Sequence, residues 1–230
     1  MKKKHIVLIL FIGLVFIGAS CGREEEAKKE LSTSKIIRQD AFIRDEIRVN
    51  IDEDDEKERV VLYVLDKEVE KDTDIWCGNV SGEQMAGKFY LALIDNDKIK
   101  SRIELLMSYL ENGNDYAEKK IILAQDLNGD NEKLEFVFST YGSCNGNYIE
   151  IISWDFEEEE LVRYKFYNKG EVSEELFISP MIGNGLEYKD NFLIQEYYSN
   201  VEPSGIFHNY YSFSKDRGGY NFEKTIKITD

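Results

Sequence analysis

The stretch "DLNGDNEKLEFVF", residues 126–138, places three oxygen-bearing side chains around a glycine and then continues as an alternating apolar run. Asp126, Asn128 and Asp130 occupy alternate positions, so a tight loop would turn them towards one centre. Calcium prefers about 6–8 oxygen ligands, and a carboxylate such as Glu135 could complete the shell. The run that begins at Glu135 is typical of a strand. The stretch therefore predicts a polar loop between two strands, either a cation site or only a turn.

Three hairpins recur along the chain at a nearly constant interval. They are "KFYLALIDNDKIKSRIEL", "NYIEIISWDFEEEELVRYKF" and "FHNYYSFSKDRGGYNFEKTIKI". Each has two alternating strands around a polar turn, and the turns open at Asp95, Asp155 and Asp216, which are 60 and 61 residues apart. A near-constant period of this length indicates repeated supersecondary units.

A further pair of strands precedes each hairpin. The pairs are "IRVNI" with "RVVLYVL", "KIILAQ" with "EFVFST", and "LFISPMI" with "NFLIQEYYS". In the third pair the two strands are joined through "GNGLEYKD". We therefore expect one all-β domain at residues 36–230, built of three repeated four-stranded antiparallel units near 44–110, 117–170 and 174–230. The many Tyr, Ile, Val and Phe residues agree with this. In "SRIELLMSYLENG" the apolar spacing is also helical, so a helix and a strand running into a loop are alternatives there.

The loop of the first unit occupies the same slot as residues 126–135. In "NIDEDDEKE" oxygen ligands again fall at alternate positions, and the candidate ligands are Asn50, Asp52, Asp54 and Glu58. Calcium is the expected cation for both loops. The alternative is an inherited turn that Asp and Asn hold in shape through hydrogen bonds to the backbone.

"DLNGD" followed by an acidic residue and an apolar strand resembles the FG-GAP or VCBS class of β-propeller repeat. The resemblance implies propeller-like blades with a calcium-type loop between two strands. The sequence departs from that pattern at Asn131, where a glycine is usual, at Glu53 and Asp55, and in "GNGLEYKD", which lacks the acids. Closed propellers typically have about 4–8 blades, so closure stays open. Either the three units form an open or strongly curved arrangement of three sheets, or the ring closes through another chain or a split fourth blade from residues 31–45.

The N-terminus is typical of an export signal. Three lysines precede an apolar run from Ile6 to Ile17, which is short for a membrane span. Residues 17–21, "IGASC", resemble a bacterial lipobox, which implies a signal peptide at 1–20, an acylated Cys21 and a flexible tether at 21–35. We therefore expect the protein on the extracytoplasmic face of a bacterial cell membrane, held there by its lipid. Ordinary cleavage that leaves a free thiol is the alternative.

Two cysteines lie at matching places in the first two units. Cys77 and Cys144 each follow the second strand of their unit and precede the third. Adjacent units would present them at the same end, and a disulfide persists outside the cytoplasm, so we expect a Cys77–Cys144 bond. Two separately buried thiols are the alternative.

The net charge and the histidine content narrow the classes of partner and of catalytic site that the chain could have. The chain has 29 basic and 45 acidic residues, and loss of Lys2, Lys3 and Lys4 with the signal leaves 26 against 45, a formal net charge of −19. Such a domain does not attract nucleic acid. His208 is the one histidine beyond the signal, which weakens histidine-based zinc sites and Ser-His-Asp catalysis.

These features predict a lipid-anchored, non-catalytic binding or interaction protein at the cell surface, with calcium-type loops and an unknown protein or glycan as its partner. Two alternatives belong to other classes. One is an inhibitor or immunity-type partner of a basic exported protein, which the acidity would suit. The other is a carboxylate-dependent glycoside hydrolase, which needs only two acids and no histidine.

Overall fold

The computed structural model describes residues 32–51, 56–71, 83–107, 109–111, 121–143, 146–179 and 185–228. Apart from α1 and the short 3-10 turn η1, every described element is a strand, which confirms the all-β prediction. In chain order the elements are α1 (Thr33–Ile36), β1 (Phe42–Val49), β2 (Glu58–Lys71), β3 (Glu83–Asp95), β4 (Lys98–Glu104), β5 (Tyr109–Glu111), β6 (Ala124–Gln125), β7 (Glu135–Ser143), β8 (Gly146–Asp155), β9 (Glu160–Arg163), β10 (Lys165–Asn168), β11 (Glu171–Ser173), β12 (Leu176–Ile178), β13 (Leu186–Lys189), β14 (Phe192–Ser199), β15 (Gly205–Ser214), η1 (Lys215–Arg217) and β16 (Gly219–Ile228).

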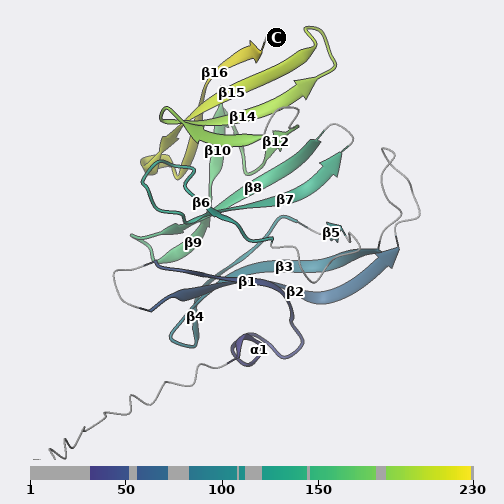
Figure 1. Ribbon diagram of the computed structural model, residues 1–230, viewed down its shortest axis with the longest axis vertical. Helices are drawn as coiled ribbons and strands as arrows, with labels where there is room; N and C mark the ends of the chain where they lie inside the picture. Colours follow the sequence, from purple (N-terminus) through teal and green to yellow (C-terminus); the bar gives the residue numbers. More distant parts are fainter. Residues whose placement is uncertain are drawn as a thin grey trace, which may run out of the picture. The chain divides into compact units, whose positions relative to one another are not determined.

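The strands form three open sheets, named A, B and C (Figure 1). Sheet A has the order β1-β2-β3-β4, with β5 also paired to β3. Sheet B has the order β12-β8-β7-β6, with β9 also paired to β8, and sheet C has the order β11-β10-β16-β15-β14-β13. Each sheet contains an antiparallel meander of four successive strands: β1–β4, β6–β9 and β13–β16.

All three predicted hairpins are present. β3 pairs with β4 around Asn96 and Asp97, whose positive φ angles of 48° and 60° suit a two-residue hairpin turn. β8 pairs with β9, and β15 pairs with β16 around η1. Short polar turns between alternating strands are therefore a reliable signal in this chain.

The predicted first strand pair of the third unit is wrong. β12, from "LFISPMI", pairs with β8 in sheet B, and β13 lies inside "GNGLEYKD". β13 pairs with β14 around Asp190 and Asn191, whose φ angles are 52° and 65°. These two residues make a two-residue hairpin turn, so the strand before the turn must lie directly upstream of it.

The boundary between the second and third units also differs from the prediction. β10, expected at the end of the second unit, pairs in parallel with β16 of sheet C. Gly219 allows this approach, since a Cβ there would lie 2.0 Å from Lys165 O. The β10–β11 hairpin therefore belongs to sheet C, whereas β12 belongs to sheet B.

In the described residues 101–107 and 109–111 the strand-and-loop alternative holds, and these residues form no helix. β4 ends at Glu104, and Leu105 N donates to Phe89 O (2.9 Å), which keeps the chain beside β3. Leu105 and Met107 are buried in the core between sheets A and B. Pairing with β3 therefore overrides the local helical spacing. No helix in the described part of the chain has the length and apolar composition needed to cross a bilayer.

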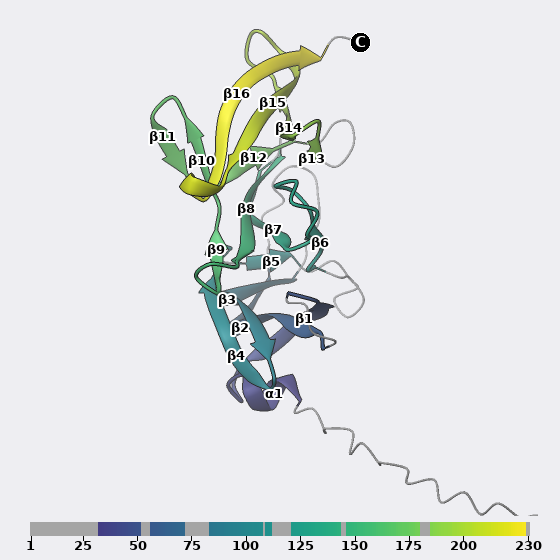
Figure 2. The same cartoon turned by 90° about the vertical axis from the view of Figure 1, so that its left-hand side faces the viewer.

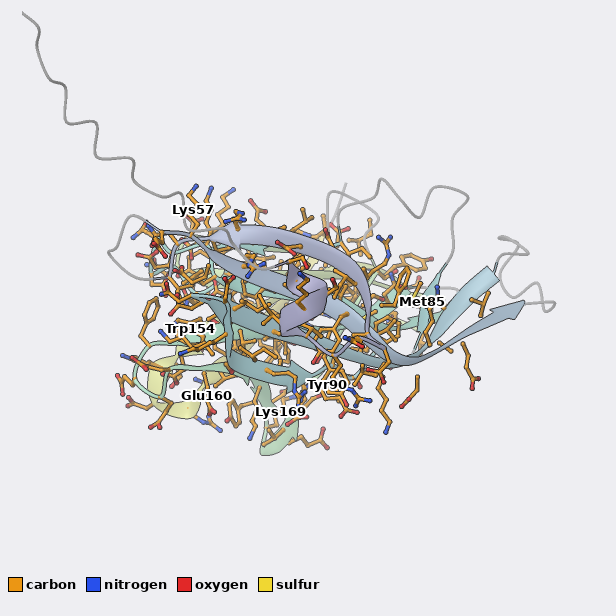
Figure 3. The ribbon with its side chains drawn as sticks, turned by 90° about the horizontal axis from the view of Figure 1, so that it is seen from below. Lys57, Met85, Tyr90, Trp154, Glu160 and Lys169 are labelled. Carbon is orange, nitrogen blue, oxygen red and sulfur yellow. The ribbon has the colours of Figure 1, made fainter. Side chains whose placement is uncertain are left out.

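The sheets follow one another in the order A, B and C (Figures 1 and 2), and the apolar side chains form three cores along this series. The first core lies between sheets A and B and the second between sheets B and C. The third covers the other face of sheet A, where Ile36, Ile37 and Ile43 pack on the strands and α1 lies across them (Figure 3). The N-terminal segment is therefore a cover and an edge strand of sheet A, not a separate fourth sheet.

Sheet B lies in the middle and is apolar on both faces. The pair Phe136↔Ile152 contributes to the core with sheet A, and the next pair, Val137↔Ile151, faces sheet C. Successive residues of a strand point to opposite faces, so a strand buried on both faces reads as a continuous apolar run. This explains the apolar runs "FVF" at 136–138 in β7 and "II" at 151–152 in β8.

Phe136 tests the stacking of sheets A and B. Its side chain is 1% exposed in the first core, so Phe136→Ala should lower the free energy of unfolding by about 3–5 kcal/mol through lost burial and a cavity. Urea denaturation would measure it. Phe156→Ala is the matched control, because Phe156 is 53% exposed and its loss should change stability by less than about 0.5 kcal/mol. Equal effects of the two substitutions would contradict the stacking.

Candidate functional site

The loop between β6 and β7 has the shape that the sequence predicts. The Asp126 carboxylate accepts hydrogen bonds from Gly129 N (2.7 Å) and Asn131 N (3.1 Å). Gly129 and Asn131 have φ angles of 80° and 71°, and asparagine enters this left-handed region more easily than most residues. The replacement of a glycine by Asn131 therefore leaves the turn intact.

Asn128 lies at the centre of the loop. Its Oδ1 accepts from Asp130 N (3.0 Å), while its Nδ2 lies 2.8 Å from Asp130 Oδ2 and 3.1 Å from Glu135 Oε1. Tyr164 OH is a third oxygen, 3.3 Å from the same nitrogen. The amide nitrogen thus donates between two carboxylates.

Glu135, the first residue of β7, closes the loop from inside the protein. It is 1% exposed, and its carboxylate accepts from Leu127 N (2.9 Å) and Ser153 Oγ (2.9 Å). Desolvation by burial is the main cause that raises the pKa of Glu135 to about 7. Asp130 and Asp126 act in the same direction, whereas the hydrogen bonds from Leu127 N and Ser153 oppose it.

The loop also joins sheet B to sheet C. Leu127 is buried in the second core, and its carbonyl accepts a hydrogen bond from Tyr220 OH (3.0 Å) of β16. A Cβ on Gly129 would lie 2.1 Å from Tyr188 OH of β13. A glycine is therefore required at 129 both for its backbone angle and for the close approach of sheet C.

The loop of the first unit repeats the closing contact. Ile51 N donates to Glu58 Oε2 (2.9 Å), as Leu127 N does to Glu135 Oε2 (2.9 Å). Glu58 is 2% exposed and begins β2, as Glu135 begins β7. The structural correspondence of the two loops therefore extends to the buried glutamate. Asn50 is exposed at the start of this loop, and Asp52 and Asp54 lie outside the described residues.

Another buried carboxylate, that of Glu150, joins sheets A and B. Glu150 of β8 is fully buried and accepts from Leu106 N (2.8 Å) and Arg163 Nε (2.8 Å). Burial raises the pKa of Glu150, and the hydrogen bond from Arg163 opposes this effect. Arg163 also donates to Glu104 O (2.6 Å) at the end of β4. Both Glu135 and Glu150 thus hold backbone groups at a junction between sheets.

The side chains of residues 126–135 that could bind a metal offer carboxylate and amide oxygens, the ligand atoms that a hard cation such as calcium prefers. In the part of the chain that the structure describes, no three histidine, cysteine or acidic side chains converge closely enough to hold a metal ion. Asn128 Nδ2 lies between the oxygens of Asp130 and Glu135 instead.

The structure adds residues to the site that sequence reasoning missed. They are Ser153, Tyr164, Tyr188 and Tyr220, all of which contact the loop from strands or the segments between them. The one sequence signal was the lone serine inside the apolar run of β8. The other predicted positions, Cys21, Cys77 and Cys144, lie outside the described residues.

Comparison with protein-family models, curated proteins and solved structures gives no match to this chain.

The contact between Gly129 and Tyr188 gives a sharp test of the junction. Gly129→Ala should lower the free energy of unfolding by about 1–3 kcal/mol more than Gly170→Ala, as measured by chemical denaturation. Both glycines have positive φ angles, 80° and 92°, but a Cβ at Gly170 meets nothing within 4 Å. The difference therefore isolates the clash with Tyr188. It should disappear when Tyr188→Ala is also present, and persistence of the difference in that background would contradict the assigned contact.

Proposed function

We propose that this chain is a lipid-anchored, extracytoplasmic binding protein in which stacked sheets serve as a scaffold and the Asp126–Glu135 loop takes up calcium. The observation that carries the proposal is the construction of this loop. Asp130 Oδ2 and Glu135 Oε1 both lie close to Asn128 Nδ2, and the shape of the loop is held by hydrogen bonds and by contacts from two sheets. A loop built so firmly from ligand-type side chains suits a cation that strengthens a structural junction.

The arrangement of the three meanders supports the interpretation of the repeats as propeller-like blades. Each runs through four antiparallel strands in sequence order, and successive meanders share an apolar core. The two calcium-type loops join the first and second strands of the first two meanders, the slot that the FG-GAP or VCBS resemblance implies. In the third meander this slot holds the short Asp190–Asn191 turn, which supplies too few oxygens for a site.

Calcium would be held by Asp126, Asn128, Asp130 and, from within, Glu135. The carboxylates of Asp130 and Asp126 repel the charge that Glu135 would carry, which contributes to its raised pKa. A divalent cation among them would offset this repulsion. Because Leu127 and Gly129 of the same loop contact sheet C, calcium would also stabilise the junction of sheets B and C.

A binding role is favoured over catalysis by the positions of the groups that chemistry would need. Glu135 and Glu150 are buried and hold backbone groups between sheets. His208 Nε2 lies 3.1 Å from Glu196 Oε2 on β14, so this histidine is engaged with a strand neighbour. These residues stabilise the scaffold, which would leave recognition to exposed surfaces.

The lipid anchor rests on the lipobox-like residues 17–21. Residues 21–35 would form the flexible tether between the acylated Cys21 and the domain.

Calcium binding is tested by thermal unfolding of the mature chain with Cys21→Ser, in calcium and in chelator. The midpoint should rise with calcium and saturate, and the stabilisation should reach about 2.7 kcal/mol at a hundredfold excess over the Kd. The rise should vanish in Asp126→Ala with Asp130→Ala. Asp155→Ala with Asp216→Ala removes the same charge from two hairpin turns and should keep it. An equal shift in both double variants would contradict the site.

The anchor is tested by growing the bacterial host with labelled fatty acid and separating its membranes. The wild-type chain should carry the label and remain with the membrane, because the Cys21 thiol is the acylated group. Cys21→Ser should lose both properties, whereas Cys77→Ser should keep them. Membrane retention of Cys21→Ser without label would contradict lipid anchoring.

A further inference from the structure

The loop between β6 and β7 contains an Asn–Gly pair, Asn128–Gly129, that is open to solvent. Asn128 is half-buried and Gly129 is exposed. An asparagine loses its side-chain amide most readily before a glycine, because glycine has no Cβ to shield its backbone nitrogen. The chain has three further Asn–Gly pairs, at 112–113, 145–146 and 184–185. The loss of the amide at Asn128 can therefore be compared with the same reaction elsewhere in one molecule.

Deamidation of this pair is a ring closure followed by hydrolysis. Gly129 N gives its proton to a base in the solvent and attacks Asn128 Cγ, so a new C–N bond forms. The bond from Cγ to Nδ2 breaks, and Nδ2 takes up a proton and leaves as ammonia. Water then opens the five-membered imide at either carbonyl carbon, which gives aspartate or, from the backbone carbonyl of Asn128, isoaspartate. Water is the only co-reactant, and no group is oxidised or reduced.

The folded loop restrains both groups that would react. Gly129 N donates its proton to Asp126 Oδ1 (2.7 Å), and the negative charge of that carboxylate opposes deprotonation of the nitrogen. The Asn128 amide is held as well, because its Oδ1 accepts from Asp130 N (3.0 Å) and its Nδ2 donates to Asp130 Oδ2 (2.8 Å) and Glu135 Oε1 (3.1 Å). Ring closure must break these contacts, so it requires local opening of the loop.

Either product of deamidation disturbs the closed loop. Aspartate puts a carboxylate oxygen where Asn128 Nδ2 now donates to Asp130 and Glu135, so two attractive contacts become repulsive. Isoaspartate adds one carbon atom to the main chain between Leu127 and Gly129. These two residues make the contacts of the loop with β16 and β13. Both products therefore weaken the contact of the loop with sheet C.

From these contacts we propose that Asn128 is a deamidation site that Asp126 protects, and that its conversion irreversibly loosens the junction between sheets B and C. Because the loop must open before the reaction, modified chains accumulate in proportion to how often the loop opens. The inference goes beyond the proposed binding role. It depends neither on the lipid anchor nor on calcium.

Peptide mapping by mass spectrometry tests the protection in the mature chain with Cys21→Ser. The protein is incubated with chelator at mildly alkaline pH, once in its native state and once in urea, and chelator separates the result from the calcium site. Asn128 should deamidate at least about tenfold more slowly in the native protein than in urea, because the closed loop holds both reacting groups. In urea its rate should approach the rates of the other three Asn–Gly pairs.

Substitution of Asp126 tests which contact protects the site. Asp126→Ala should speed deamidation of Asn128 in the native protein at least about tenfold, because it releases Gly129 N. Asp126→Asn keeps an acceptor oxygen and should restore part of the protection. Asp155→Ala is the matched control, since the Asp155 carboxylate accepts from Glu157 N (2.8 Å) in another turn, and it should leave the rate at Asn128 unchanged. The comparison of native protein with urea does not depend on the folding of any variant.

Asn128→Asp reproduces the aspartate product and tests its effect on the junction. In chelator it should raise the equilibrium constant for unfolding at least about threefold more than Asn128→Ala, which removes the amide without adding a charge. Equal rates at Asn128 in native protein and in urea would overturn the protection, and so would an unchanged rate in Asp126→Ala. Equal stability of Asn128→Asp and Asn128→Ala would overturn the loosening of the junction.

Discussion

The fold depends on carboxylates that are withdrawn from water and surrounded by hydrogen-bond donors. Glu135 takes a backbone donor from the loop and a hydroxyl donor from β8, and the loop that it fixes in turn contacts β13 and β16. Glu150 of β8 accepts hydrogen bonds from Leu106 N, just after β4, and from the guanidinium of Arg163, which also donates to Glu104 O at the end of β4. Burying such a group is costly unless its acceptors are satisfied, so each glutamate forces the surrounding backbone into one arrangement. The apolar cores lie between the sheets, and these acids hold the backbone of the β6–β7 loop and of the segment that follows β4.

The sequence predicts most of the strands because local signals determine them. The hairpins at Asp95, Asp155 and Asp216 could be predicted from alternation and polar turns, and both Asp-rich loops fall between the expected strands. The exchange of β10 and β12 between sheets could not be read in this way. It depends on long-range pairing, including a parallel pair that Gly219 permits, and alternation within a strand carries no information about which partner lies beside it.

The candidate site shows the same division. The positions of Asp126, Asn128 and Asp130 follow from their spacing, and the structure places them in one tight loop. Tyr188 and Tyr220 come from strands about sixty and ninety residues further along the chain, so no local pattern could place them there. The burial of Glu135 could not be predicted from the sequence either. A glutamate at the start of a strand is ordinarily an exposed residue, and only packing against β8 shows that this one is buried.

The position of β16 within sheet C has a consequence for biosynthesis. β16 is the last described strand, yet it lies between β15 and β10 and not at the edge of the sheet. During synthesis from the N-terminus, sheet A and most of sheet B can form before residues 219–228 are available. The β10–β11 hairpin has an open edge until β16 inserts beside it. A chain without residues 219–228 would lack the strand that joins the two halves of sheet C, and its open strand edges would make it prone to aggregation and proteolysis.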